Sequence, residues 1–130
     1  MKEELDRKLC EDFPILYQQR GNSMQQTAMC WGFEHGDGWE PLIRELSEKI
    51  ETYNKEHPDN PVEATQIKEK YWSLRFYVSN YPDKIDKLID EAETKSETTC
   101  ELCGKESKGI SGKGWYVNYC DECLKRKNDE

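Results

Sequence analysis

The chain has 130 residues, with 19 Lys and Arg against 27 Asp and Glu, so its formal net charge is −8. Residues 1–94 hold this whole excess, with 12 basic and 20 acidic side chains, and a body of that sign repels a nucleic-acid phosphate backbone. Charged and hydrophobic residues each make up 35% of the chain, so we expect a modest hydrophobic core.

The sequence also argues against secretion and membrane insertion. Its first residues form no apolar run like that of a signal peptide, and no stretch has the length of a membrane span. We therefore expect a cytoplasmic protein with reduced thiols and no membrane partner, rather than a disulfide scaffold, although the chain holds six cysteines.

The first half of the sequence predicts two helices and a strand. Residues 2–12 place Leu5 and Leu9 at helical spacing, which indicates a short amphipathic helix. Residues 27–33 are rich in large apolar side chains and predict a strand. A second helix is expected over residues 39–53, capped by Asp37 or Gly38, with one apolar stripe made of Leu42, Ile43, Leu46, Ile50 and Tyr53.

The second half adds strand and helix. Residues 62–71 suit either a helix turn or a strand, residues 72–79 alternate like a half-buried strand, and one strand over 62–78 with a bulge at Tyr71-Trp72 is also consistent. A helix is expected over residues 83–95, whereas residues 124–130 should fray. The fold class is therefore α+β: a small antiparallel sheet covered by two or three helices, followed by a C-terminal segment that holds four of the six cysteines. We divide the chain into an acidic body, residues 1–96, and this C-terminal segment, residues 97–130.

Two Cys-x-x-Cys pairs, separated by sixteen residues, give the clearest chemical signal in the sequence. This spacing is typical of a four-thiolate Zn2+ site, and the predicted ligands are Cys100, Cys103, Cys120 and Cys123. We therefore expect residues 97–130 to form a zinc ribbon. Glycines between the pairs allow tight turns, and residues 115–119 read as a returning strand. Four thiolates leave no open coordination position, so we interpret the zinc as a structural staple rather than a catalyst.

A second set of reactive residues lies in the first half of the chain. These residues are Cys30, His35 and Asp37, whose types occur in nucleophilic active sites and as metal ligands. However, no third group is placed to orient a base. The alternative is that Gly36-Asp-Gly-Trp39 is a structural turn, with His35 exposed, that anchors the following helix through its indole.

The sequence contains, in this order, the blocks Gly36-Asp-Gly-Trp39, Leu74-Arg-Phe-Tyr77 and the two cysteine pairs of the predicted ribbon. These blocks resemble those of a family of small phage, prophage and bacterial proteins. The resemblance implies a phage or mobile-element setting, where small acidic proteins commonly bind and disable a host defence protein. Family members often have Cys at the position of His35, which leaves a metal role for this residue open.

We therefore expect a non-enzymatic, zinc-stapled binding protein in the bacterial host cytoplasm. It would bind a basic host protein, such as a nuclease or defence factor, and inhibit it in the manner of an anti-CRISPR protein. The candidate binding residues are Glu45, Glu48, Asp86, Asp90, Trp115 and Tyr116.

Two alternatives stay open. One is a nucleic-acid-binding regulator that uses the lysines and the arginine of the ribbon: Lys105, Lys108, Lys113, Lys125, Arg126 and Lys127. The other is a small enzyme centred on Cys30, His35 and Asp37.

Overall fold

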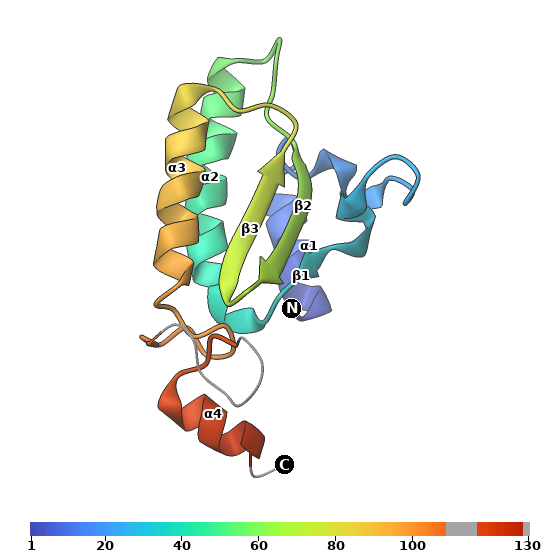
Figure 1. The fold of residues 1–130 in the computed structure, drawn as a ribbon. Helices are drawn as coiled ribbons and strands as arrows, with labels where there is room; N and C mark the ends of the chain where they lie inside the picture. Colours follow the sequence, from blue (N-terminus) through green and yellow to red (C-terminus); the bar gives the residue numbers. More distant parts are fainter. Residues whose placement is uncertain (109–116, 129–130) are drawn as a thin grey trace.

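The computed structural model describes residues 1–108 and 117–128. Four α-helices, three strands and three short 3-10 helices follow one another along these ranges (Figure 1). Their order is α1 (Glu3–Asp12), η1 (Gln18–Gly21), η2 (Ala28–Trp31), β1 (Phe33–Glu34), η3 (Asp37–Trp39), α2 (Glu40–Glu56), β2 (Ala64–Lys70), β3 (Ser73–Val78), α3 (Asp83–Ser96) and α4 (Asp121–Asn128). None of the helices in the described part of the chain is long and apolar enough to cross a membrane.

The strands form one sheet in the order β1-β2-β3. Strands β2 and β3 form an antiparallel hairpin, which was not predicted from the sequence. Strand β1 pairs with β2 in parallel, so the sheet is mixed rather than antiparallel. Helices α2 and α3 run side by side, in opposite directions, along one side of this hairpin (Figure 1). The α+β fold class predicted from the sequence is confirmed.

Apolar side chains from α2, α3 and the hairpin meet in a single core. Helix α2 buries Ile43, Leu46 and Ile50, which recur every three or four residues and so share one face. The strands contribute Ile67, Leu74 and Phe76, and the residues that follow each of them, Lys68, Arg75 and Tyr77, are half-buried or exposed. The helices predicted over 39–53 and 83–95 are both present, at Glu40–Glu56 and Asp83–Ser96.

Side chains accept hydrogen bonds from the backbone amides along the outer edge of β3. Ser96 accepts a hydrogen bond from the Leu74 amide at 2.8 Å, and Glu93 accepts one from the Phe76 amide at 2.9 Å. Tyr81 accepts a third from the Val78 amide at 3.2 Å. An edge whose donors are already satisfied cannot pair with a further strand, so this arrangement limits edge-to-edge association.

The strand predicted over residues 27–33 was wrong. Residues 28–31 form the 3-10 helix η2, and the strand β1 that follows consists of Phe33 and Glu34 alone. The Thr27 hydroxyl accepts the Met29 amide at 3.1 Å and caps this turn, and Gly32, at φ 73°, ends it. Trp31 is 63% exposed, so apolar content alone misled the prediction.

A continuous strand over residues 62–78 was also wrong. Tyr71 and Trp72 have φ angles of 50° and 66° and form the turn of the β2–β3 hairpin. Two-residue hairpin turns of this kind normally carry Asn-Gly, because both residues need positive φ. Glu69 accepts the Trp72 amide at 2.9 Å and holds the turn, and the irregular pairing lies between Ala64 and Gln66 instead.

The C-terminal segment is more ordered than expected. Residues 124–128, predicted to fray, belong to α4, whose acidic first turn and basic last turn complement the helix dipole. The predicted strand over 115–119 begins at Trp115 and Tyr116, which lie outside the described residues. The division at residues 96 and 97 stays a prediction, although hydrogen bonds cross it in several places.

Candidate metal centre

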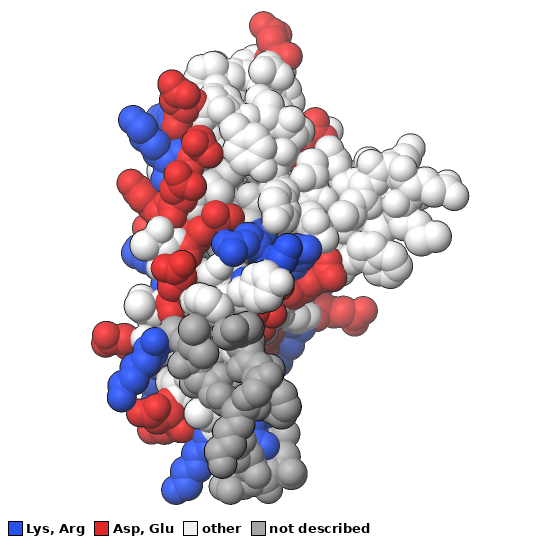
Figure 2. Space-filling view, in the orientation of Figure 1, with Lys and Arg blue, Asp and Glu red and all other residues white. Residues whose placement is uncertain are grey.

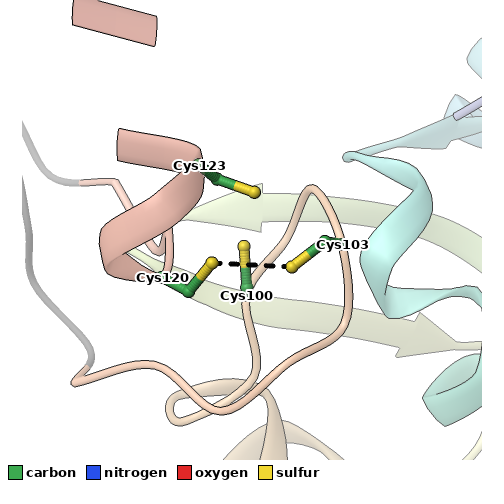
Figure 3. Close-up of side chains that lie close together, drawn as sticks. All are labelled: Cys100, Cys103, Cys120 and Cys123. Carbon is green, nitrogen blue, oxygen red and sulfur yellow. Dashed lines mark hydrogen bonds between the residues drawn. The ribbon is translucent and has the colours of Figure 1, made fainter. Parts of the chain in front are cut away.

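The first cysteine pair sits in a tight turn that follows α3. The Gly104 amide donates to the Cys100 carbonyl at 2.9 Å, and the Cys100 amide donates to the Lys105 carbonyl at 2.7 Å. Gly104 has a φ of 83°, a conformation that glycine adopts without the steric penalty of a Cβ atom. This turn aims the Cys100 and Cys103 side chains toward one point (Figure 3).

The second pair lies at the start of α4. Cys120 immediately precedes the helix and Cys123 is in its first turn, and the Leu124 amide donates to the Cys120 carbonyl at 2.9 Å. Residues three apart at a helix start project from one side, so both sulfurs face the first pair (Figure 3). The predicted cysteine set is therefore brought together from two segments separated by sixteen residues.

The four sulfurs have the spacing that a metal ion requires. All four Sγ atoms lie within 4.8 Å of one another, and those of Cys103 and Cys120 are 3.5 Å apart. A tetrahedral Zn2+ ion with Zn–S bonds of 2.3 Å places its sulfurs about 3.8 Å apart, so the donor set fits this ion. Cys100, Cys120 and Cys123 are buried, whereas Cys103 faces solvent.

The thiols of the cluster ionise unequally: burial raises the pKa of Cys103 and raises the pKa of Cys123 to about 12, whereas the pKa of Cys120 is lowered. The backbone N–H of Cys123 lowers the pKa of Cys120 to about 7, because this donor stabilises the thiolate. The Arg126 guanidinium donates to the Cys123 sulfur at 3.1 Å and brings a positive charge to the site. Since a metal binds thiolates rather than thiols, both contacts assist metal binding.

The metal module, defined here as residues 97–108 and 117–128, docks on the turn that precedes α2. The Glu101 backbone and side chain accept hydrogen bonds from the amides of Gly38, at 2.7 Å, and Gly36, at 2.9 Å. The indole of Trp39, which is fully buried, donates to the Thr99 carbonyl at 2.8 Å. The first cysteine turn is thus fixed to the body by three hydrogen bonds.

Close backbone approach explains the two glycines of this turn. A Cβ atom on Gly38 would overlap the Cys100 carbonyl oxygen and lie 2.6 and 2.7 Å from the amide nitrogens of Gly104 and Cys103. A Cβ atom on Gly36 would lie 2.5 Å from the Glu101 carbonyl oxygen. Neither glycine has a positive φ, so proximity to the metal module, and not backbone conformation, requires them.

Comparison with models of protein families, with curated proteins and with solved structures found no match.

Asn118 is a second link between module and body that the sequence did not reveal. Its fully buried side-chain amide donates to the carbonyls of Trp72, at 2.8 Å, and Ser96, at 2.6 Å. Its side-chain oxygen accepts the Ser107 hydroxyl, and its own carbonyl accepts the Glu101 amide at 2.8 Å. One asparagine between Val117 and Tyr119 carries no motif, so only the assembled fold reveals this role.

The residues of the proposed enzyme centre have separate structural partners. The His35 ring packs near Phe33 and Trp39 and donates from Nδ1 to the Gly36 carbonyl at 2.8 Å. Asp37 accepts the Lys2 amide at 2.8 Å and does not cap α2, contrary to expectation. Cys30 is half-buried in η2. Within residues 1–108 and 117–128, the four cysteines of the module are the only group placed to share a metal ion.

His35 differs from the exposed residue that its position in a turn predicted. Its side chain is buried, and burial lowers its pKa to about 4 because a buried imidazolium loses hydration. Its Nε2 atom is buried and has no hydrogen-bond partner among the described residues. The ring therefore acts as a neutral, largely apolar filler beside Trp39.

The predicted acidic binding residues lie on the exposed surfaces of α2 and α3. Glu45, Glu48, Asp86 and Asp90 are all exposed, and acidic side chains gather over α3 in the space-filling view (Figure 2). Glu45 forms ion pairs with Lys49 at 3.4 Å and with Lys95 at 3.7 Å. The other two predicted binding residues, Trp115 and Tyr116, lie outside the described residues.

Proposed function

We propose that the metal is zinc and that it has a structural role. The proposal is supported by the four sulfurs within 4.8 Å of one another. Four thiolates fill a tetrahedral shell and leave no position for water or substrate, which is the pattern of structural zinc. The ion then replaces the apolar core that a segment of this size lacks.

We further propose that the protein acts by contact rather than by chemistry, as a zinc-stapled binding protein. Its contact surface is the acidic surface of α2 and α3, defined by Glu48, Asp86, Asp90 and Glu91. The observation that carries this proposal is that these exposed carboxylates form no ion pair with any described residue. The exposed lysines Lys84 and Lys87 of α3 form no ion pair with a described residue either, but these four carboxylates outnumber them. An excess of one sign favours association with a surface of the opposite sign.

The proposed partner is a basic protein, such as a host nuclease or defence factor that the chain inhibits. The net charge of −8 supports a basic partner. The phage setting rests on the resemblance of the sequence blocks to small phage and prophage proteins. The chain would inhibit such a partner by occupying its nucleic-acid-binding surface, because acidic side chains compete with phosphate groups for the same basic side chains.

Affinity capture from a phage-infected bacterial lysate tests this function. We expect a basic protein to be captured, and its affinity to fall as salt rises, because salt screens exposed charges. The triple variant Glu48→Gln/Asp86→Asn/Asp90→Asn should lose capture. A control variant with the same change in net charge, Glu3→Gln/Glu4→Gln/Asp59→Asn, replaces exposed acids elsewhere and should retain it. Equal behaviour of both variants, or binding that ignores salt, contradicts the proposal.

A second candidate function is nucleic-acid binding by the metal module. It is favoured by the basic last turn of α4, where Lys125, Arg126 and Lys127 are exposed. A gel-shift assay with DNA and RNA at low salt tests it. Retardation that disappears in Lys125→Glu would support it, and no retardation by the native protein would remove it.

A further inference from the structure

A groove of about 660 Å³ lies between the start of α2 and the end of α3. Its lining includes the apolar side chains Leu42 and Leu46 of α2, and Leu88 and Ala92 of α3. Leu42 and Leu88 are only partly buried, so part of their apolar surface stays open to the groove. A hollow of this size with an apolar lining is a typical docking site.

The charged residues around the groove are mainly acidic. Its two lysines, Lys49 and Lys95, both pair with Glu45, at 3.4 and 3.7 Å. The remaining charged lining residues are all carboxylates with no ion pair among the described residues: Asp90, Glu91 and Glu97. These three carboxylates lie on α3 or directly after it, so an occupant that bears positive charge on the side of its apolar stripe toward α3 would satisfy this lining.

The length of the groove matches a short helix. Its lining extends from Leu42 to Lys49 on α2, and such a helical segment is about 10 Å long. On the other side the lining runs from Leu88 through the end of α3 to Thr98. This span accommodates about two turns of a third helix laid along α2 and α3.

We propose that this groove binds an amphipathic helix of the partner protein, with a leucine-type apolar stripe against Leu42 and Leu88 and basic residues toward Asp90, Glu91 and Glu97. Recognition of this kind reads apolar anchors at helical spacing. The inference rests on the proposed function and deepens it, because it assigns the contact to one groove and one class of segment.

A designed peptide tests the groove without knowledge of the partner. The probe is a fluorescent peptide of about 14 residues with leucines at i, i+3, i+4 and i+7 and lysines beside them. Two matched peptides serve as controls, one scrambled so that the stripe is lost and one with every lysine replaced by glutamate. Fluorescence anisotropy gives the affinities, and amide chemical shifts of the full chain show where the probe binds.

We expect the probe to bind about tenfold more tightly than either control, with shift changes in residues 42–49 and 88–98. Glu91→Lys should weaken probe binding about tenfold, whereas Glu4→Lys, which makes the same change in net charge at an exposed position of α1 outside the groove lining, should weaken it about threefold or less. Leu88→Ser should also weaken it without a change in charge.

The failures of groove and function are distinguishable. If the scrambled peptide binds equally and Glu4→Lys weakens binding as much as Glu91→Lys, net charge alone holds the probe and the groove proposal is wrong. Equal binding of the glutamate peptide overturns the basic occupant. If the probe does not bind while the lysate capture succeeds, the partner binds elsewhere and the groove proposal falls alone.

Discussion

The body and the metal module are stabilised by different means. The body buries nineteen hydrophobic residues in one core, whereas the buried cluster of the module consists of three cysteines, with Leu102 and Tyr119 packed against it. Apolar burial can hold the first by itself, but the second has too little apolar surface to fold alone. In the module, sulfur–metal bonds would take the place of a core.

The two regions nevertheless meet through specific backbone contacts. The turn before α2 binds Thr99 and Glu101 of the module, and Asn118 binds two carbonyls of the body. These hydrogen bonds need both partners in place. Loss of the metal should therefore also break the hydrogen bonds that Gly38 and Trp39 donate to the module. The two regions are therefore stabilised by different means, but a change in the module should alter the part of the body that contacts it.

Metal removal should have the largest effect. We expect a chelator to abolish amide-exchange protection in residues 97–108 and 117–128, because the metal supplies most of the folding free energy of this segment. Amides of α2 that lie around Ile43 and Ile50 should keep their protection, while the Gly38 amide, which donates to Glu101, should lose it. Hydrogen exchange with mass spectrometry provides the measurement. Unfolding of α2 together with the module would refute the contrast between the two regions.

Gly38→Ala should have the next largest effect, since it disrupts the contact between the body and the metal module. The added methyl group would overlap the Cys100 carbonyl oxygen, and overpacking of this kind costs about 1–3 kcal/mol of stability. The control is Gly21→Ala, because no atom lies within 4 Å of the Cβ position at Gly21. Denaturant titration compares the free energies of unfolding, and equal stability of the two variants would mean that the docking contact is not tight.

The sequence predicted more of the body and of the metal ligands than of the contacts between the body and the metal module. The α2 and α3 stripes and the Cys-x-x-Cys spacing are local patterns, which a single sequence displays. The role of Gly38 depends on the approach of Cys100, 62 positions along the chain, and that of Asn118 on two distant carbonyls. The Tyr71-Trp72 turn was missed for another reason, because bulky residues at positive φ run against turn preferences.

Acidification should weaken the body through His35, by a smaller amount. The pKa of His35 is lowered to about 4 by burial, with the Met1 amino group lowering it further and the Gly36 carbonyl and Asp37 acting in the opposite direction. The unfolded chain, with a histidine pKa of about 6.5, therefore binds the proton more readily, so stability present above pH 6.5 is lost as pH falls toward 4. At pH 5.5 the loss is about 1 kcal/mol relative to pH 7.5.

Two variants separate this effect from acid-induced metal loss, which the native chain and both variants share. His35→Gln should show a shallower dependence of unfolding free energy on pH than the native chain, whereas His57→Gln, at an exposed position, should keep the native dependence. Parallel pH profiles for the native chain and His35→Gln would show that this histidine does not titrate as its burial requires.

Tyr71→Asn should have the smallest effect, and it should stabilise the hairpin. Tyr71 has a φ of 50° and is 57% exposed, and asparagine tolerates this conformation better than a bulky aromatic residue. We expect a gain of about 0.5–1 kcal/mol in thermal or denaturant unfolding. The control Tyr77→Asn, at an exposed position in β3, should instead lose stability because asparagine is a poor strand former. A loss at Tyr71 would indicate that its ring contributes more than its backbone costs.

Metal analysis of the full chain purified under reducing conditions tests the central claim most directly. Four thiolates in one tetrahedral site predict one zinc ion per chain, and loss of that ion when Cys123 is replaced by serine but not when Cys10 is replaced by serine. Protein that is folded in residues 97–108 and 117–128 without stoichiometric metal would contradict the account.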